Sequence, residues 1–318
     1  MNQLSRDLTI SRNRLLWPYL MLAGSALFWA GNIITGRALR GEVPPFTLNF
    51  LRWAIALLVL LPFTYGQVQA QWSLVKAHSK LILSLGFTGI AAFQSCVYIA
   101  VQTTTAVNTI LFLTLTPVVI VLLSWLTWGE KLSRPQHLGI ILSFMGAVFL
   151  IIQGRLDNLL AFRFNPGDLW MLLAVLLWAI YSLLLRRRPA GLAQPVFLTS
   201  IIMAGLLFII PVFLIALFNG ATMRFSLPNL LGVAYIGLFP SVLAFLFWNR
   251  GVSEVGASKA GMFMHLMPVF GAALSFVFLG EGLALYHLGG AALVFGGIVL
   301  MSRGAAASPE KSATNFTN

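Results

Sequence analysis

The sequence predicts an all-α integral membrane protein with ten transmembrane helices, arranged as two inverted five-helix repeats around a central cavity. Three observations support this fold class. Of the 318 residues, 59% are hydrophobic and only 9% are charged, which is too little polar surface to cover a globule in water. Apolar runs of about the 20 residues that cross a bilayer recur along the chain. One long stretch also occurs twice.

The duplicated stretch is residues 106–152, which align without a gap on residues 257–303 after a shift of 151 positions. The two copies share 15 identities in 47 pairs, whereas a composition this apolar would match roughly one pair in ten by chance. Each copy predicts an apolar helix, a Gly-Glu break and a second apolar helix. The shared residues include Pro117 with Pro268, Gly129 and Glu130 with Gly280 and Glu281, Gly139 with Gly290, and Gly146 with Gly297.

The duplication extends upstream with a shift of 149 positions. That shift pairs Trp29 and Ala30 with Trp178 and Ala179, Arg37 with Arg186, and Pro62 with Pro211. Each copy then holds five helices. Because five is odd, the second copy must enter the membrane facing the opposite way.

The chain divides into five parts. A polar, basic segment, 1–14, precedes the first repeat, 15–153; a polar joint, 154–167, leads to the second repeat, 168–303; and the polar tail, 304–318, is expected to be disordered. The expected spans are 15–35, 46–64, 81–102, 106–127 and 136–152, then 168–185, 195–217, 230–249, 258–279 and 285–302. Each must be a helix, because an open strand edge in lipid would leave backbone groups unbonded. The first run lacks a small-residue cleavage site, so we expect a retained helix rather than a signal peptide.

Lysine and arginine indicate the orientation, because they concentrate in the cytoplasmic loops of membrane proteins. With the N-terminus inside, the inner segments hold 13 Lys and Arg residues and the outer segments hold 5; Arg52 and Lys259 lie within spans. We therefore expect a multi-pass protein of the bacterial inner membrane, the plasma membrane, with both termini cytoplasmic. The net charge of +12 could indicate nucleic-acid binding, but the basic residues lie beside the spans. We therefore expect the chain to contact a lipid bilayer and no nucleic acid.

The residue counts also bear on chemistry. The single Cys96 excludes an internal disulfide, and four scattered histidines form no cluster, so neither a metal nor a cofactor is expected. An intramembrane enzyme would need a metal set or a nucleophile-base pair, and neither is visible. An assembly factor would need a soluble domain or a long binding loop, which the sequence also lacks.

Both repeats contain the same pattern: a proline in the middle of helix four or nine, then Gly-Glu, then a closing helix that carries glycines. This duplicated pattern resembles the EamA-type permeases of the drug/metabolite transporter (DMT) superfamily. The resemblance covers residues 15–302. It implies a transporter that works by alternating access around a central cavity and exports amino acids or related small metabolites. Within the family the chain is most similar to amino-acid exporters, including those for aromatic amino acids. A monomer is expected, and a dimer remains open.

Inverted repeats commonly hold the substrate near the bilayer midplane, where helices interrupted by proline or glycine expose backbone groups. Pro117 and Pro268 fit that role. An equal alternative is that each proline only kinks its helix, with Thr114 or Thr116 satisfying the freed carbonyl. The glycines of helices five and ten, in contrast, indicate close helix packing. Glu130 and Glu281 are expected to bond the first amides of the helix that follows each of them.

Polar side chains within spans are costly unless they face protein or a water-filled cavity. They concentrate in helices one, three, four, six, eight and nine, so helices two, five, seven and ten are expected to form a lipid-facing scaffold. Lys259 is expected to bind a substrate carboxylate, amide oxygens to accept from the ammonium, and aromatic rings to line the wall. The candidate substrate-binding residues are Asn32, Tyr98, Gln102, Asn108, Tyr181, Trp248, Lys259 and His265. A buried, satisfied side chain is equally compatible with each position.

Charged residues within and beside the spans limit the coupling mechanism. Arg52 is expected to snorkel outward and Arg250 to anchor helix eight at the interface. All eight acids fall in loops, tails or span ends, so facilitated transport is expected. His265 ordinarily changes charge near neutral pH and could couple protons, or it could simply be packed. A sugar-phosphate or nucleotide-sugar antiporter, the alternative function, would need several cations near the cavity.

The charge count generates a topological prediction. Cysteines introduced at Arg224 and Arg187, in a Cys96→Ser background, should be labelled by a membrane-impermeant maleimide from opposite sides of the membrane. Labelling of both positions from the same side in intact cells would contradict the inverted arrangement.

Overall fold

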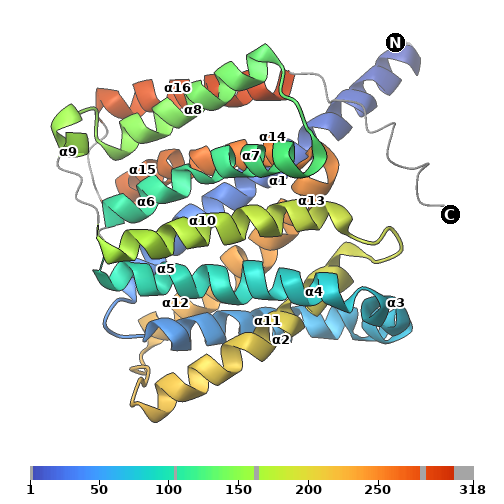
Figure 1. The fold of residues 1–318 in the computed structure, drawn as a ribbon, viewed down its shortest axis with the longest axis vertical. Helices are drawn as coiled ribbons and strands as arrows, with labels where there is room; N and C mark the ends of the chain where they lie inside the picture. The colour runs from blue at the N-terminus through green and yellow to red at the C-terminus, as the bar shows by residue number, and fades with distance from the viewer. Residues whose placement is uncertain (1–2, 104–105, 161–164, 280–283, 304–318) are drawn as a thin grey trace.

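A computed structural model of the chain describes residues 3–103, 106–160, 165–279 and 284–303. All regular structure in these residues is helical. Within the described ranges, nine helices are long and apolar enough to cross a membrane. The remaining expected span, 258–279, is divided into three shorter pieces. The fold is therefore the predicted all-α membrane bundle, and Figure 1 shows its helices running nearly parallel across the view in stacked layers.

The elements follow the predicted order through both repeats. The first repeat comprises α1 (Gln3–Ala38), α2 (Pro45–Ala70), α3 (Trp72–Ala77), α4 (Ser79–Leu85), the π-helix η1 (Gly86–Ala92), α5 (Phe93–Thr103), α6 (Ala106–Thr114), α7 (Thr116–Trp128) and α8 (Arg134–Ile151). The short α9 (Leu156–Leu160) follows. The second comprises α10 (Pro166–Leu184), the 3-10 helix η2 (Leu185–Arg187), α11 (Gln194–Phe218), α12 (Leu227–Leu238), the π-helix η3 (Phe239–Leu243), α13 (Ala244–Val255), α14 (Ala257–Gly261), the 3-10 helix η4 (Met262–His265), α15 (Leu266–Leu279) and α16 (Leu285–Arg303).

Local sequence signals account for the helix ends. A capping box of Ser133 with Gln136 starts α8, so the backbone amides there are satisfied without Glu130. Glu130 therefore does not have the capping role expected for it. Gly129 stops α7 with a φ of 63°, a left-handed conformation that glycine adopts without steric cost. The polar punctuation between the spans thus follows ordinary capping chemistry.

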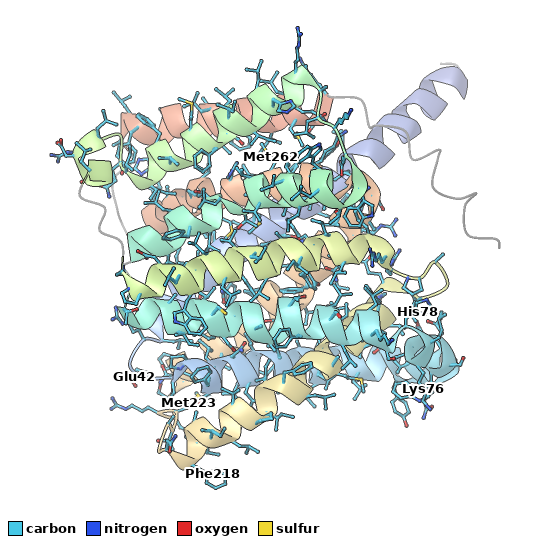
Figure 2. The ribbon with its side chains drawn as sticks, viewed as in Figure 1. Glu42, Lys76, His78, Phe218, Met223 and Met262 are labelled. Carbon is cyan, nitrogen blue, oxygen red and sulfur yellow. The ribbon has the colours of Figure 1, made fainter. Side chains whose placement is uncertain are left out.

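The bundle has two chemically different ends. We call them the basic end, formed by residues 71–79, 129–133 and 185–193, and the opposite end, formed by residues 39–44, 152–160 and 219–226. Figure 2 places Lys76 and His78 at the basic end and Glu42 and Met223 at the opposite end. The basic end carries Lys76, Lys80, Lys131, Arg134, Arg186, Arg187, Arg188, Arg250 and Arg303.

A close helix crossing joins α8 to α16, and its contacts follow the symmetry of the two repeats. A Cβ built on Gly139 would lie 2.7 Å from the carbonyl oxygen of Gly297, and one on Gly146 would lie 2.8 Å from that of Gly290. The repeat shift relates Gly139 to Gly290 and Gly146 to Gly297. Each glycine therefore packs against the counterpart of the other, as residues do around a two-fold axis. These glycines serve helix packing, as the sequence predicted.

The same pseudo-two-fold axis passes through the other layers. The Trp29 and Trp178 rings, which are repeat counterparts, meet edge to face with centroids 5.1 Å apart. Between α2 and α11, Phe50 stacks on Phe213 at 4.2 Å, and the counterparts of these two residues, Thr199 and Thr64, share a hydrogen bond of 3.0 Å. In Figure 1 the α8–α16 and α2–α11 pairs form the two edges of the bundle, with α1 and α10 between them.

Backbone irregularities also occur at equivalent places. The π-helices η1 and η3 occupy corresponding parts of the third helix of each repeat. The helices α7 and α15 begin one and two residues before Pro117 and Pro268, respectively. At η3 the Pro240 carbonyl accepts from Trp29 Nε1 at 3.2 Å and the Ala244 carbonyl accepts from the Ser25 hydroxyl at 2.9 Å. Side chains of α1 therefore satisfy backbone groups that this irregular turn leaves available.

The α8–α16 crossing generates a stability prediction. Gly146→Ala should lower the melting temperature of the detergent-purified protein, at a cost of about 1 to 3 kcal/mol, because its Cβ would lie within 2.8 Å of backbone atoms of α16. Gly289→Ala is the matched control, since its Cβ meets only the Phe149 ring at 3.6 Å. Equal melting temperatures for the two variants would show that this crossing is not closely packed.

Candidate functional site

The best candidate site is an apolar crevice of about 240 Å³ between α1, the halves of helices four and nine, and the ends of α8 and α16. It runs from mid-span residues, such as Thr114 and Pro268, to Gln153 and Tyr286 at the opposite end. None of its described lining residues is lysine or arginine. The lining comprises Ala30, Ile33, Ile34, Ile110, Leu113, Thr114, Leu150, Ile151, Gln153, Met264, Met267, Pro268, Gly271, Ala272, Tyr286 and His287.

The inner limit of the crevice is the point where helices four and nine break. Pro117 has no amide hydrogen, and the chain turns at Leu115 between α6 and α7. His265, at the end of η4, donates from Nε2 to the Thr114 carbonyl at 3.0 Å. Thr114 and His265 are repeat counterparts, so this bond also crosses the pseudo-two-fold axis. The two broken helices are thus tied together beside the crevice.

His265 is completely buried and has a partner at each ring nitrogen. A carbonyl oxygen can only accept, so Nε2 must carry the hydrogen in the bond to Thr114. Nδ1 then accepts from the Ser143 hydroxyl of α8 at 2.7 Å. With one ring nitrogen donating and the other accepting, the imidazole is neutral, and it links α8, the break of helix four and η4.

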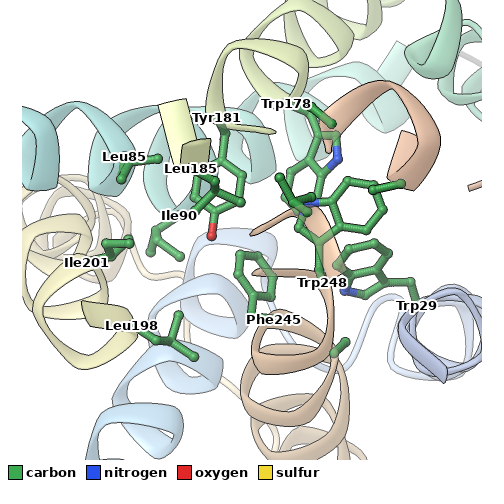
Figure 3. Packing of buried hydrophobic residues seen from close by; sticks show 14 of the residues in the cluster. Trp29, Leu85, Ile90, Trp178, Tyr181, Leu185, Leu198, Ile201, Phe245 and Trp248 are labelled. Atoms are coloured by element: carbon green, nitrogen blue, oxygen red, sulfur yellow. The ribbon is translucent and has the colours of Figure 1, made fainter. Parts of the chain in front are cut away.

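Between the crevice and the basic end lies a group of packed aromatic side chains, which we call the central aromatic cluster: Trp29, Trp178, Tyr181, Phe245 and Trp248 (Figure 3). The Trp29 and Trp178 rings lie 5.3 and 5.7 Å from the Trp248 ring. Trp248 and Tyr181 are fully buried. The cluster therefore fills the centre of the bundle instead of lining an open wall.

Tyr181 also has a polar partner across the bundle. Its hydroxyl donates to Asn249 Oδ1 at 2.9 Å, which joins α10 to α13. A shift of 149 pairs Tyr181 with Asn32. In the third helix of each repeat the shift is 151, which also aligns the ends of η1 and η3, and it pairs Asn249 with Tyr98, so the same amide and phenol types recur with their positions exchanged. Asn32 and Tyr98 are both partly exposed. The two pairs are thus in different environments in this conformation.

The remaining sequence candidates with described side chains, Lys259 and Tyr98, do not line the crevice. Lys259 is partly buried in α14, near the basic end, and does not line the crevice. Gln102 and Asn108 have side chains outside the described residues. Tyr98 packs at the opposite end with Leu48 and Ile236. Of the six candidates with described side chains, Tyr181 and Trp248 lie together in the central aromatic cluster and His265 lies at the helix breaks.

Arg52 does not snorkel, contrary to the sequence expectation. Its residue is only 2% exposed, and its Nε donates to the Ser241 hydroxyl of η3 at 2.8 Å. The guanidinium carbon lies 5.1 Å from the centre of the Trp53 ring. The side chain is held between α2 and η3 because these partners lie toward the protein interior.

The basic end is closed by contacts between the repeats. Glu130 accepts from Arg186 at 2.7 Å, and the Arg186 guanidinium lies over the Trp128 ring at 4.7 Å. Nearby, partial burial and the like charge of Arg250 lower the pKa of Arg188. Arg250 is itself paired with Glu254 of the same helix. The expected anchor therefore contributes to a mixed ionic surface.

Sequence reasoning missed two polar positions on helices expected to be bare. Ser143 lies on the same face of α8 as Gly139 and Gly146, which is the face packed against α16. Asn49 lies three residues before Arg52 and is almost completely buried. The spacing to neighbouring glycine or polar residues could have indicated an inward face. Among the described residues, no three His, Cys, Asp or Glu side chains are placed to hold a metal.

Comparison with known proteins gives a consistent family match. The model of the EamA-like transporter family matches residues 16–152 and 165–303. The chain is 30% identical over 285 residues to "Uncharacterized transporter YetK" of Bacillus subtilis, covering 88% of this chain and 85% of the relative. It is 25% identical over 226 residues to a "Probable terminal-alkyne amino-acid exporter" of Streptantibioticus cattleyicolor, covering 70% and 73%. A solved crystal structure matches with a TM-score of 0.72 at 20% identity, covering 89% of this chain and 96% of its own.

The His265 linkage generates a prediction about two buried serines. Ser143→Ala should destabilise the protein by about 1 to 3 kcal/mol, because it removes the hydroxyl that donates to His265. Ser124→Ala is the control, since Ser124 is equally buried but its hydroxyl has no hydrogen-bond partner. Chemical or thermal unfolding in detergent measures both effects. A loss of stability no greater for Ser143→Ala than for Ser124→Ala would contradict the linkage.

Proposed function

Because the chain belongs to the EamA-like transporter family, and is therefore a membrane transporter, we propose that it exports amino acids and related small metabolites by alternating access, without a coupling ion. The observation that carries this proposal is the crevice at the helix breaks. It reaches the opposite end of the bundle, whereas the central aromatic cluster fills the interior toward the basic end. A solute held at the breaks would therefore have access from one end at a time.

The proposed location is the bacterial plasma membrane, with both termini in the cytoplasm. The distribution of 13 basic residues against 5 supports this orientation. The basic end then faces the cytoplasm and the crevice opens outward. In this conformation a released solute would leave the crevice on the outer side, which is the final step of export.

Differences between the repeats support alternating access. The counterparts of Phe245 and Trp248 in the first repeat are Gln94 and Val97, which are smaller. Aromatic bulk is therefore concentrated toward the basic end. In the inward-open form, the central aromatic cluster would separate and the outer halves of the helices would approach.

Two repeat-related polar pairs could close the two ends of the bundle in turn. Tyr181 and Asn249 are bonded in the buried half, while their counterparts, Asn32 and Tyr98, are partly exposed. The proposed inward-open form separates the first pair and brings the second pair together. At the basic end, the Glu130–Arg186 ion pair would also separate. The repeat counterparts of that ion pair lie outside the residues whose side chains are described.

The crevice chemistry supports a small, mainly apolar solute. Its described lining is dominated by aliphatic and thioether groups, with few polar side chains. Its volume is just below the roughly 300 to 1,000 Å³ typical of ligand pockets, which suits an amino acid better than a nucleotide sugar. The absence of lysine and arginine from the described lining also disfavours a phosphorylated substrate. The named amino-acid exporter among the relatives points in the same direction.

The proposed polar contacts serve different steps of transport. Lys259, near the cytoplasmic end, would attract the substrate carboxylate as the inward-open form binds it. Asn32, Gln102 and Asn108 would offer amide oxygens to the ammonium. Tyr98, Tyr181 and Trp248 would present aromatic surface as the central aromatic cluster separates.

Facilitated transport is proposed because the only fully buried carboxylate among the described residues, Asp168, belongs to the capping box that starts α10. The sequence places its acids in loops, tails or span ends. His265, the other candidate for coupling, has both ring nitrogens engaged with Ser143 and Thr114. Protonation at Nδ1 would require the Ser143 hydroxyl to turn from donor to acceptor. We therefore assign His265 to holding the breaks together.

A transport assay tests the crevice with a matched pair of variants. Gly271 lines the crevice, and a Cβ there meets no atom within 4 Å, so Gly271→Leu should fill the crevice without disturbing folding. It should slow efflux of labelled phenylalanine from proteoliposomes by about tenfold or more. Gly66→Leu is the control, because Gly66 is exposed, lies elsewhere and has equally open space at its Cβ.

Wild-type efflux should run down the substrate gradient, and an imposed pH gradient should not drive uphill accumulation. No transport of any amino acid by the wild type would overturn the proposed substrate class. Full activity of a folded Gly271→Leu variant would instead overturn the assignment of the crevice.

A further inference from the structure

One face of α2 carries three buried side chains with unused hydrogen-bond donors. Asn49, Arg52 and Trp53 are 1%, 2% and 1% exposed. Asn49 Nδ2, Arg52 Nη1 and Trp53 Nε1 each lack a hydrogen-bond partner. Residues three and four apart lie on the same side of a helix. The described structure therefore leaves these three donors, and the Asn49 Oδ1 acceptor beside them, without hydrogen-bond partners.

The group also carries a positive charge that the described structure does not neutralise. An arginine side chain stays protonated in proteins, and taking a charge out of water costs several kcal/mol unless it is compensated. The contacts of Arg52 are the Ser241 hydroxyl, the Trp53 ring and a hydrogen bond with Tyr98. No described ion pair involves Arg52. Glu42, the nearest acid along the chain, is bonded to Arg224 and Asn229.

The repeat symmetry provides an internal control for this group. The counterparts of Asn49, Arg52 and Trp53 on α11 are Leu198, Ile201 and Ile202, all fully buried. Figure 3 shows Leu198 and Ile201 packed in the same interior as Ile90, which is the counterpart of Ser241. The same helix crossing is therefore built from aliphatic side chains in the second repeat. Packing alone does not require an arginine or an asparagine at these positions.

The partner of Arg52 lies in an irregular part of the backbone. The Ser241 hydroxyl donates to the Ile236 carbonyl at 2.8 Å, so its oxygen is left to accept from Arg52 Nε. This bond orients the guanidinium while Nη1 remains available. Ser241 belongs to the π-helix η3, and such helices occur frequently at functional sites.

From these observations we propose that Arg52 Nη1 and Asn49 Nδ2 form a binding site for a monovalent anion, with the size and charge of a halide or a carboxylate. A single negative charge neutralises the guanidinium and gives both donors an acceptor. A phosphate dianion fits less well, because it would leave charge uncompensated beside one arginine. The occupied site would join α2 to η3 through the anion.

The anion has two sources, which the experiment separates. It is either a halide from solution or the carboxylate of the transported solute, and the second source rests on the proposed function. In this conformation the site is closed to solvent, so access requires α2 and η3 to move apart. That movement would occur at the end of the bundle where the crevice opens.

The test is the melting temperature of the detergent-purified full chain in sodium chloride and in sodium sulfate at equal ionic strength. Parallel samples in sulfate receive phenylalanine or phenylalaninamide, which lacks the carboxylate. We expect chloride or phenylalanine to raise the melting temperature with concentration, and phenylalaninamide to have a much weaker effect. Chloride alone indicates a halide site, whereas phenylalanine that competes with chloride indicates the substrate carboxylate.

The double variant Asn49→Leu/Arg52→Ile reproduces the residues of the second repeat and should lose the anion response. Asn49→Leu alone keeps the charge and should weaken the apparent affinity about tenfold, so it keeps the test decisive if the double variant does not fold. An unchanged response in a folded double variant, or the same wild-type melting temperature in all solutions, would overturn the site. A chloride response in a protein that transports no amino acid would retain the anion site and reject the proposed function.

Discussion

Hydrocarbon offers the backbone no hydrogen-bond partner, and this constraint determines where the chain can depart from a regular helix. The two π-helices and the breaks of helices four and nine all lie where protein groups are available. His265 satisfies the Thr114 carbonyl at one break, and Ser25 and Trp29 donate to carbonyls of the third-helix irregularity in the second repeat. The crevice is a consequence of the same constraint, because interrupted helices cannot fill the space between them as regular helices do.

Contacts between repeat counterparts lie along the pseudo-two-fold axis. Glycines bring α8 and α16 together, Thr114 and His265 meet at the breaks, and Trp29 meets Trp178 in the layer beyond. The two copies keep the backbone arrangement but differ in chemistry around it. Aromatic bulk lies toward the basic end, and the Arg52 group lies on α2 where α11 has aliphatic residues. The backbone arrangement is therefore shared between the repeats, while the buried side-chain chemistry differs between them.

Features that depend on one helix or on the repeat were predictable from the sequence. Hydropathy indicated the spans, Pro117 and Pro268 indicated the breaks, and the paired glycines indicated a close crossing. Features that depend on partners far along the chain were not. Arg52 was expected to turn toward water because its contact with Ser241, 189 residues away, is invisible in the sequence of α2. Glu130 was expected to cap the next helix, but Ser133 and Gln136 already satisfy that end, and Arg186 approaches from the other repeat.

The inexact symmetry has an energetic consequence. If the two copies were identical and the surroundings were the same on both sides, rotation about the axis would convert the outward-open form into the inward-open form. The two forms would then be isoenergetic. Any intrinsic preference must therefore come from positions where counterparts differ, such as Trp248 and Val97 or Arg52 and Ile201. Substitutions that make such a pair identical would move the populations of the outward-open and inward-open forms toward equality, even where the substituted residues touch no solute. The sequence divergence between the copies therefore determines which form is more populated at rest.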